Sequence, residues 1–166
     1  MIKKIVLILF LVLILAGCGK KTKYTDLYYK DGFYYCWGEE KPFSGKTYGY
    51  YDSGKIYHIT NFKNGKENGN LIIYSQNGDI DLRANYKDGK IDGEQIIYYD
   101  NGKIFHKNHY KDGKLNGVET EYYKNGKLKY SRNYVNWKLE GEEIEYSEDG
   151  KVISKKIYSG DEVVKK

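Results

Sequence analysis

Three stretches of the chain share one pattern: FKNGKENG at residues 62–69, YKDGKIDG at 86–93 and YKDGKLNG at 110–117. Each copy begins 24 residues after the previous one. The same period links six series of matching residues, and two of these are the glycines Gly54, Gly78, Gly102, Gly126 and Gly150 and the aromatics Phe62, Tyr86, Tyr110, Tyr134 and Tyr158. A fixed period of this length is the signature of a repeat architecture.

Each repeat carries the signal of a β-hairpin. Asn-Gly and Asp-Gly pairs separate short runs rich in Tyr, Ile and Thr, and both turn residues tolerate positive φ. Two strands cannot bury both faces alone, so neighbouring repeats are expected to pair edge to edge. The sequence therefore predicts an all-β fold, an elongated antiparallel meander of β-hairpin repeats over residues 45–160.

Two local features of the repeats lead to further expectations. Simple two-residue turns would put Tyr74 and Ile80 on opposite faces, whereas a one-residue bulge at Gly78 would bring them together. We favour the bulge because it gathers the aromatic and aliphatic rows into one stripe. Trp137 replaces the glycine of the tight turn in the last full repeat. Because positive φ is costly for Trp, this turn is expected to differ from its equivalents.

The N-terminus has the features of a bacterial lipoprotein signal. Two lysines precede residues 5–16, none of which has a polar side chain. This apolar stretch is shorter than the roughly 20 residues of a membrane-spanning helix and fits a signal-peptide core. The motif Leu15-Ala16-Gly17-Cys18 resembles the lipobox of such proteins. The resemblance implies cleavage before Cys18, acylation of that residue and a lipid-anchored location at the cell envelope, in the outer membrane if the bacterium is diderm.

Composition and charge limit the remaining classes. The formal net charge of +5 falls to +3 once Lys3 and Lys4 are removed with the signal, which is too small to indicate nucleic-acid binding. Two cysteines exclude a disulfide framework and a Cys-rich zinc site. We divide the chain into a signal peptide (1–17), a tether (18–28), a degenerate capping unit (29–44), the repeats (45–160) and a tail (161–166).

The repeat itself resembles a known family. The unit F/Y-K-N/D-G-K-x-x-G is similar to the MORN repeat, and Y-x-x-N-G-K-L/I between the copies is similar to its bacterial variant. Residues 31–35 and 41–45 resemble the opening of that variant family, whose members are often named YwqK-type toxin–antitoxin antitoxins. The resemblance covers residues 29–160. It implies a protein-interaction module, phospholipid binding in some members and, from the label, neutralisation of a partner toxin.

Catalytic and cofactor-binding patterns are not evident in the sequence. His106 and His109 are three residues apart on an expected strand, so their side chains point to opposite faces and cannot share a metal. Cys36 is alone after processing, so neither a disulfide within the chain nor a Cys/His nucleophilic pair is expected. We therefore expect no enzymatic activity, no cofactor and no metal.

Charged and apolar residues at equivalent positions suggest a surface for a partner. Glu119 and Glu143 are one period apart, as are Glu121 and Glu145, and we expect four clustered carboxylates on adjacent strands. Such a cluster is a cation site, a docking patch for a basic partner, or a solvated face with lysine neighbours. Earlier repeats carry aliphatic residues there, so the surface would run from apolar to acidic. The candidate partner surface consists of Leu71, Ile73, Ile97, Glu119, Glu121, Glu143, Glu145, Trp137 and Trp37.

Three functions remain open at this stage. The leading hypothesis is a non-enzymatic, lipid-anchored envelope protein whose repeats act as a protein-interaction scaffold. The alternative is an antitoxin or immunity protein that neutralises a partner toxin. A third possibility is a lipid- or glycan-binding module that uses the aromatic rows. The expected partners are a protein, either a toxin or an envelope protein, and a membrane reached through the lipid anchor.

Overall fold

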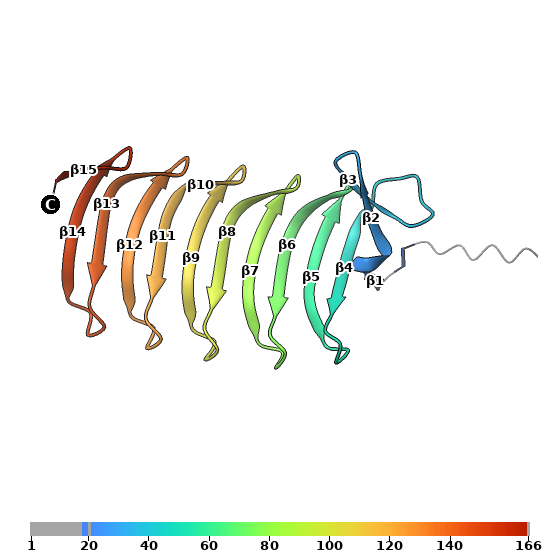
Figure 1. The fold of residues 1–166 in the computed structure, drawn as a ribbon, viewed down its shortest axis with the longest axis horizontal. Coiled ribbons are helices and arrows are strands. Elements are labelled where there is room, and N and C mark those ends of the chain that lie inside the picture. Colours follow the sequence, from blue (N-terminus) through green and yellow to red (C-terminus); the bar gives the residue numbers. More distant parts are fainter. Residues whose placement is uncertain (1–17, 20, 166) are drawn as a thin grey trace, which may run out of the picture.

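A computed structural model describes residues 18–19 and 21–165, so the expected signal peptide (1–17) lies outside the described residues. Thirteen strands form one sheet (Figure 1). The strands are β1 (Thr22–Lys23), β4 (Gly45–Tyr50), β5 (Ile56–Lys63), β6 (Lys66–Tyr74), β7 (Ile80–Lys87), β8 (Lys90–Tyr98), β9 (Ile104–Lys111), β10 (Lys114–Leu115), β11 (Gly117–Tyr122), β12 (Leu128–Val135), β13 (Lys138–Tyr146), β14 (Val152–Ser159) and β15 (Glu162–Lys165). In this sheet β4 to β15 pair antiparallel in chain order, except that the short β10 pairs only with β9, and β1 pairs in parallel with β4. The predicted all-β meander is confirmed.

Tight two-residue turns link each repeat to the next. Asn64 and Gly65 both have positive φ, 50° and 74°, which is the backbone of a two-residue hairpin turn. The N–H of Gly65 donates a 2.7 Å hydrogen bond to the carbonyl of Phe43 in the preceding segment. The same bond recurs once per repeat, from the N–H groups of Gly89, Gly113, Trp137 and Asp161. Each turn is thus tied to the repeat before it.

The turn at Trp137 has the same backbone as its equivalents, so the expectation that it differs is wrong. Asn136 and Trp137 have φ of 50° and 72°, and Val135 pairs with Lys138 across the turn. The N–H of Trp137 donates to the Leu115 carbonyl at 2.9 Å. The indole ring also meets Tyr110 edge-on, with centroids 6.0 Å apart. These contacts hold a bulky residue in a conformation that costs about 1–3 kcal/mol.

A bulge brings Tyr74 and Ile80 to one face, as predicted, although it lies elsewhere than expected. Tyr74 is the register partner of Ile80 and Ile73 is the partner of Leu82, so Asp81 is the extra residue. The same shift occurs in the equivalent pair of each repeat. The bulge therefore sits in the following strand and not at Gly78.

The repeated aromatic residues serve the packing of the sheet. Phe62 and Tyr86 are the register partners of Gly45 and Gly69, and the later tyrosines of the series pair with glycines in the same way. A glycine beside the ring leaves space for it to lie across the neighbouring strand. A second set of tyrosines joins the repeats through hydrogen bonds, in which the hydroxyls of Tyr51, Tyr99 and Tyr123 donate to the carbonyls of Tyr74, Tyr122 and Tyr146.

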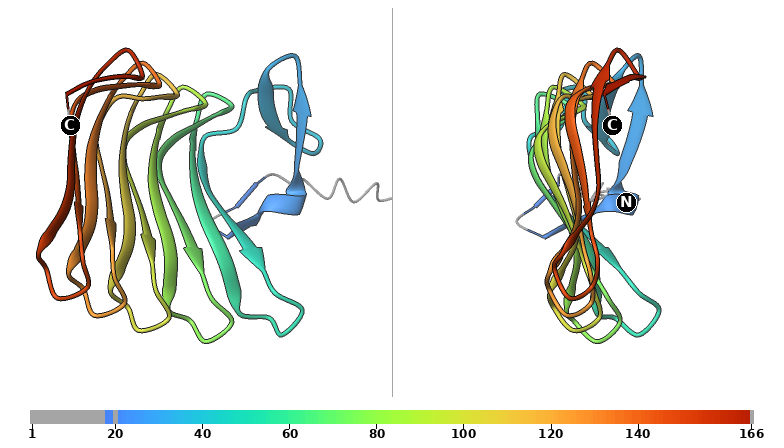
Figure 2. Two further views of the ribbon diagram at one scale, coloured as in Figure 1. Left: turned by 60° about the vertical axis from the view of Figure 1, so that its left-hand side comes forward. Right: turned by 90° about the vertical axis from the view of Figure 1, so that its left-hand side faces the viewer.

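Residues before the first repeat fold onto the end of the sheet. Strand β1 pairs in parallel with β4, and the short 3-10 helix η1 (Tyr24–Asp26) follows it. Strands β2 (Leu27–Lys30) and β3 (Phe33–Cys36) form a separate hairpin beside this end (Figure 2). The segment expected to be a tether (18–28) is thus part of a cap together with the expected capping unit (29–44). At the opposite edge, the tail supplies β15, which pairs with β14.

Gly65 offers a test of how tightly the cap is seated. A Cβ atom at Gly65 would lie 2.8 Å from Phe33 Cβ and 2.9 Å from Pro42 Cβ, whereas one at Gly113 would meet nothing nearer than 3.7 Å. Both glycines have similar positive φ, so Gly65→Ala and Gly113→Ala share a backbone cost of about 1–2 kcal/mol. Overpacking should cost Gly65→Ala about 1–3 kcal/mol more. Urea unfolding measures both losses, and equal losses would contradict the close seating of the cap.

Candidate functional site

A row of side chains crosses the sheet at mid-strand on one face, which we call the ladder face. Register partners in consecutive strands make up the row, which runs through Thr47, Thr60, Leu71, Ala84, Gln95 and Asn108 and then through Glu119, Arg132, Glu143 and Lys156. Small and apolar side chains give way to amides and then to alternating charges. Each side chain thus has a neighbour of matching chemistry, the arrangement that stabilises a sheet.

The charged end of this row forms a continuous set of ion pairs, which we call the charge ladder. Arg132 Nε lies 3.1 Å from Glu119 Oε2, and Arg132 Nη1 lies 3.7 Å from Glu143 Oε2. Lys156 Nζ and His106 Nε2 extend it at each end, 3.4 Å from Glu143 Oε1 and 2.9 Å from Glu119 Oε1. The charge ladder consists of His106, Glu119, Arg132, Glu143 and Lys156.

The expected cluster of four carboxylates on adjacent strands is therefore wrong. Glu119 lies on β11 and Glu143 on β13, and Arg132 of the intervening strand β12 separates them. Their side chains are only 12% and 7% exposed, so neither is a solvated surface charge. Glu121 is bound by Lys129 at 2.6 Å. Cations thus neutralise Glu119, Glu121 and Glu143 within the sheet itself. Glu145 lies between Tyr130 and Ser154 on β13 and forms no ion pair among the described residues.

Partial burial and close charges shift the pKa values along the charge ladder. Burial raises the pKa of Glu119, but the hydrogen bond from His106 and the charge of Arg132 outweigh it and leave the pKa below its ordinary 4.5. Burial lowers the pKa of Arg132, but Tyr130 and Glu119 more than compensate and raise it overall. The pKa of Tyr130 rises to about 12, through burial and the nearby Glu119. The Arg132 guanidinium lies 4.0 Å from the centre of that ring. Glu119 and Arg132 are therefore held in their charged forms.

The apolar residues of the predicted partner surface also lie on the ladder face. Leu71 and Ile73 line a hollow beside the cap, together with Tyr24, His58 and Tyr86. Ile97 lies in the same row across the strands as Ile73, because Leu82 on the strand between them is the register partner of both. The face thus runs from apolar to charged along the chain. The two tryptophans lie elsewhere, Trp137 at a tight turn and Trp37 beside the end of β3, with 54% and 62% of their surface exposed.

The histidines occupy opposite faces, as the spacing predicts. His106 bonds to Glu119 on the ladder face, and His109 contacts Glu94 at 3.2 Å on the other. Within residues 18–19 and 21–165, no three side chains of the kinds that bind metals come together.

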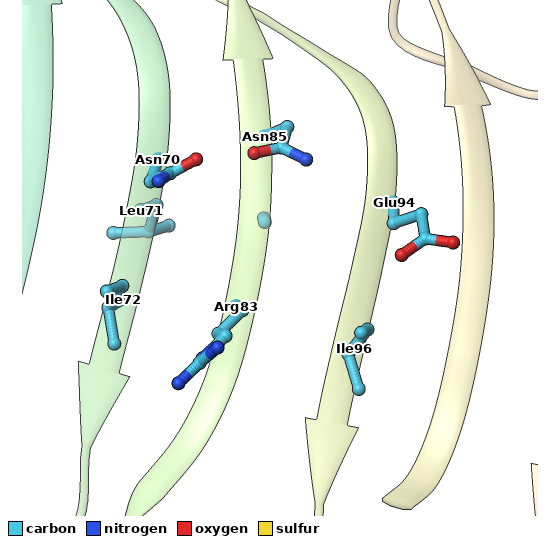
Figure 3. Close-up of a pocket in the computed structure, with 8 residues that line it drawn as sticks. Asn70, Leu71, Ile72, Arg83, Asn85, Glu94 and Ile96 are labelled. Carbon is cyan, nitrogen blue, oxygen red and sulfur yellow. The ribbon is translucent and has the colours of Figure 1, made fainter.

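The opposite face, which we call the open face, carries a polar hollow between the second and third repeats (Figure 3). Exposed Arg83 lies between the half-buried Ile72 and Ile96. Among the described residues, the ion pairs formed by arginine involve Arg132 and not Arg83. The rim is completed by Asn70, Asn85 and Glu94, the last of which is bound by Lys107 at 2.6 Å.

Sequence reasoning missed this hollow, although one signal for it existed. Arg83 and Arg132 are the only arginines of the chain. Arg132 lies two periods and one residue after Arg83, so the two arginines differ by one position within equivalent strands. Because successive side chains of a strand point to opposite faces, the two arginines lie on opposite faces of the sheet. One arginine is thus enclosed in the charge ladder, and the other lies exposed on the open face.

A disulfide joins Cys18 and Cys36, with Cα atoms 5.9 Å apart, so the expectation of no disulfide within the chain is wrong. The pairing follows from the fold of the cap, because Thr22 is buried on β4 and directs the preceding residues back towards the end of β3. Acylation would use the same sulfur atom of Cys18, so an acylated chain has Cys36 as a thiol. No helix of sufficient length and hydropathy to cross a bilayer is found in the part of the chain that the structure describes.

Glu119→Gln should show how much the charge ladder contributes to the free energy of unfolding. Because the pKa of Glu119 is lower in the folded state, its contribution to stability is complete above about pH 5 and is lost as the pH falls through the folded pKa. The substitution should cost about 1–3 kcal/mol near neutral pH and progressively less in acid. Urea unfolding as a function of pH measures this, with Glu142→Gln, which breaks the exposed pair with Lys155, as the control. A loss that is the same at all pH values would contradict the assignment.

Comparison with known protein families agrees with this architecture. The model of the MORN repeat variant matches residues 44–64, 91–112, 115–136 and 139–159, which together make up more than half of the chain. The matches leave out residues 65–90, although β6 and β7 pair there in the same register as the strands of the other repeats. No curated protein matches the chain. With four matched copies on a continuous sheet of hairpins, the chain belongs to the MORN repeat variant family.

Proposed function

We propose that the protein is a non-enzymatic scaffold that binds another protein through its second repeat (residues 67–88) and is held at the cell envelope by a lipid on Cys18. The observation that carries the proposal is the exposed Arg83 of this repeat, which lies between the half-buried Ile72 and Ile96 and forms no ion pair among the described residues. The repeat keeps the backbone pairing of its neighbours and lies between segments that the family model matches. It also contributes to the hollows on both faces of the sheet.

Arg83 is the centre of the proposed contact. Arginine beside apolar side chains is typical of the residues that dominate binding energy in protein interfaces. Ile72 and Ile96 flank it, and the amides of Asn70 and Asn85 offer both donors and acceptors. A partner would place a carboxylate against the Arg83 guanidinium and apolar groups against the isoleucines. The ladder face is less suited to a charged partner because its ions already neutralise one another.

The membrane attachment rests on the N-terminal sequence. Residues 5–16 are apolar, and Leu15-Ala16-Gly17-Cys18 has the order of a lipobox. Each acyl methylene buried in a bilayer contributes about 0.8 kcal/mol, so a lipid with more than one chain would anchor the protein stably. In this acylated form Cys36 would be a thiol; in the disulfide-bonded structure its side chain is buried.

Charge reversal at Arg83 tests the protein-binding role. The full chain is crosslinked in its own host and captured with whatever it has bound. Arg83→Glu should weaken binding by about 2 kcal/mol, or roughly 30-fold in affinity. Lys46→Glu, the same charge change on the open face of the first repeat, should leave the captured protein unchanged.

The identity of the captured protein separates the possible roles. A single small protein that is toxic when expressed alone would favour an antitoxin or immunity function. A set of non-toxic envelope proteins would favour a surface scaffold. Binding that resists Arg83→Glu but is lost in Ile73→Lys would move the contact to the ladder face. Failure to capture any protein would contradict the proposal and favour lipid or glycan binding.

Substitution of Cys18 tests the anchor separately. Cys18→Ala should abolish incorporation of a labelled fatty acid and release the protein or leave it as an unprocessed precursor. Cys36→Ala removes the same disulfide but leaves Cys18 intact, so it should label like the unchanged chain. Fatty-acid labelling followed by mass spectrometry measures both. Labelling that persists in Cys18→Ala would contradict acylation at this residue.

A further inference from the structure

The cap presents a cluster of aromatic rings on the outer face of its hairpin. Tyr28 and Tyr35 are register partners, and their rings stack with centroids 5.4 Å apart. Trp37 adds to the same stack, 4.8 Å from the ring of Tyr28, with 62% of its surface exposed. We call Tyr28, Tyr35 and Trp37 the aromatic patch. On the other face of the hairpin, Tyr34 lies 5.1 Å from Phe62 of the first repeat, and its register partner Tyr29 is exposed.

The aromatic patch adjoins the point where the chain would meet a membrane. Cys18 and Trp37 line one hollow, and Trp37 directly follows Cys36, whose Cα is 5.9 Å from that of Cys18. In the disulfide-bonded structure the Cα atoms of Trp37 and Cys18 are therefore within about 10 Å of each other. In the acylated chain, which lacks the disulfide, the pairing of Thr22 with Thr47 still holds the chain to the cap four residues after Cys18.

We infer that the aromatic patch lies in the lipid–water interface of the membrane and orients the anchored protein by its cap. The inference rests on the proposed membrane attachment, and it adds a second point of contact to the anchor. Tyrosine and tryptophan suit this environment because each combines a large apolar ring with one polar group that stays hydrated. A single flexible anchor would leave the sheet free to tumble, whereas three rings beside the anchor hold its long axis away from the bilayer.

The cap is expected to bind the bilayer through apolar contacts of its aromatic rings and not through attraction to charged headgroups. Residues 18–44 contain five lysines and four acidic residues, so the cap is nearly neutral. A polybasic surface would require anionic lipids. The aromatic patch should therefore enter zwitterionic and anionic bilayers alike.

The two tryptophans of the chain make the inference measurable. Trp137→Phe leaves Trp37 as the sole tryptophan, and Trp37→Phe leaves Trp137 as a matched reporter on a distant turn. The full chain, produced in a host that acylates lipoproteins, is reconstituted into phosphatidylcholine vesicles brominated near the headgroup end of the acyl chains. Bromine quenches only a nearby indole, so Trp37 should lose fluorescence and shift to shorter wavelength. Trp137 should be unchanged, and added phosphatidylglycerol should alter neither result.

The outcomes distinguish this inference from the proposed anchor. Vesicle-bound, acylated protein whose Trp37 is quenched no more than Trp137 would overturn the aromatic contact and leave the anchor intact. Quenching of Trp37 in a vesicle-bound Cys18→Ala chain would support the aromatic contact and overturn lipidation as the means of attachment. A chain that fails to sediment with vesicles at all would overturn both.

Discussion

Every other feature of this molecule depends on the pairing of each strand with the next in a sheet one layer thick. No second layer covers the repeats among the described residues, as the end-on view shows (Figure 2). Stability therefore comes from neighbour to neighbour contacts: the ladder hydrogen bonds, the tight-turn N–H groups that donate to the preceding repeat, and the tyrosine hydroxyls that bridge one repeat to the next. Because the backbone carries so much of the cohesion, side chains on the two faces are free to differ between repeats.

The row on the ladder face shows how that freedom is used. Near the cap, the row consists of small and aliphatic side chains, and Thr47 and Thr60 are buried there. Farther along, Asn108 and Glu143 are buried as well, each 5% exposed, and Glu119 is half-buried. Alternating carboxylates and cations can occupy these positions because each ion is neutralised by its neighbours on both sides. The change from apolar to charged side chains thus depends on the pairing of opposite charges from strand to strand and not on exposure.

The fold could be predicted from the sequence because its signals are local and repeated. The period, the Asn-Gly turns and the spacing of His106 and His109 each concern residues close in the chain. The wrong expectations involve contacts between distant residues. The Trp137 turn depends on Leu115 and Tyr110, the cap depends on Thr22 pairing beside Thr47, and the disulfide follows from that pairing. The carboxylates were expected on adjacent strands, but each repeat contributes two strands, so equivalent residues of successive repeats lie two strands apart. Arg132 occupies the strand between Glu119 and Glu143. The Arg83 hollow could not be predicted because Ile72, Arg83 and Ile96 lie on three different strands and meet only through the register of those strands.

The arrangement along the sheet links the two proposed contacts. Neighbouring strands lie about 4.8 Å apart. Measured along the sheet from β4, Arg83 on β7 is about 14 Å away and β14 is about 43 Å away. The second repeat is therefore close to the capped end, while the charge ladder occupies the far part. With the cap on the membrane, a partner at Arg83 would sit near the bilayer surface, within reach of another membrane-attached protein. The later repeats would then extend the sheet outward. Their conformity to the family pattern fits a part of the molecule whose requirement is to remain folded without a covering layer.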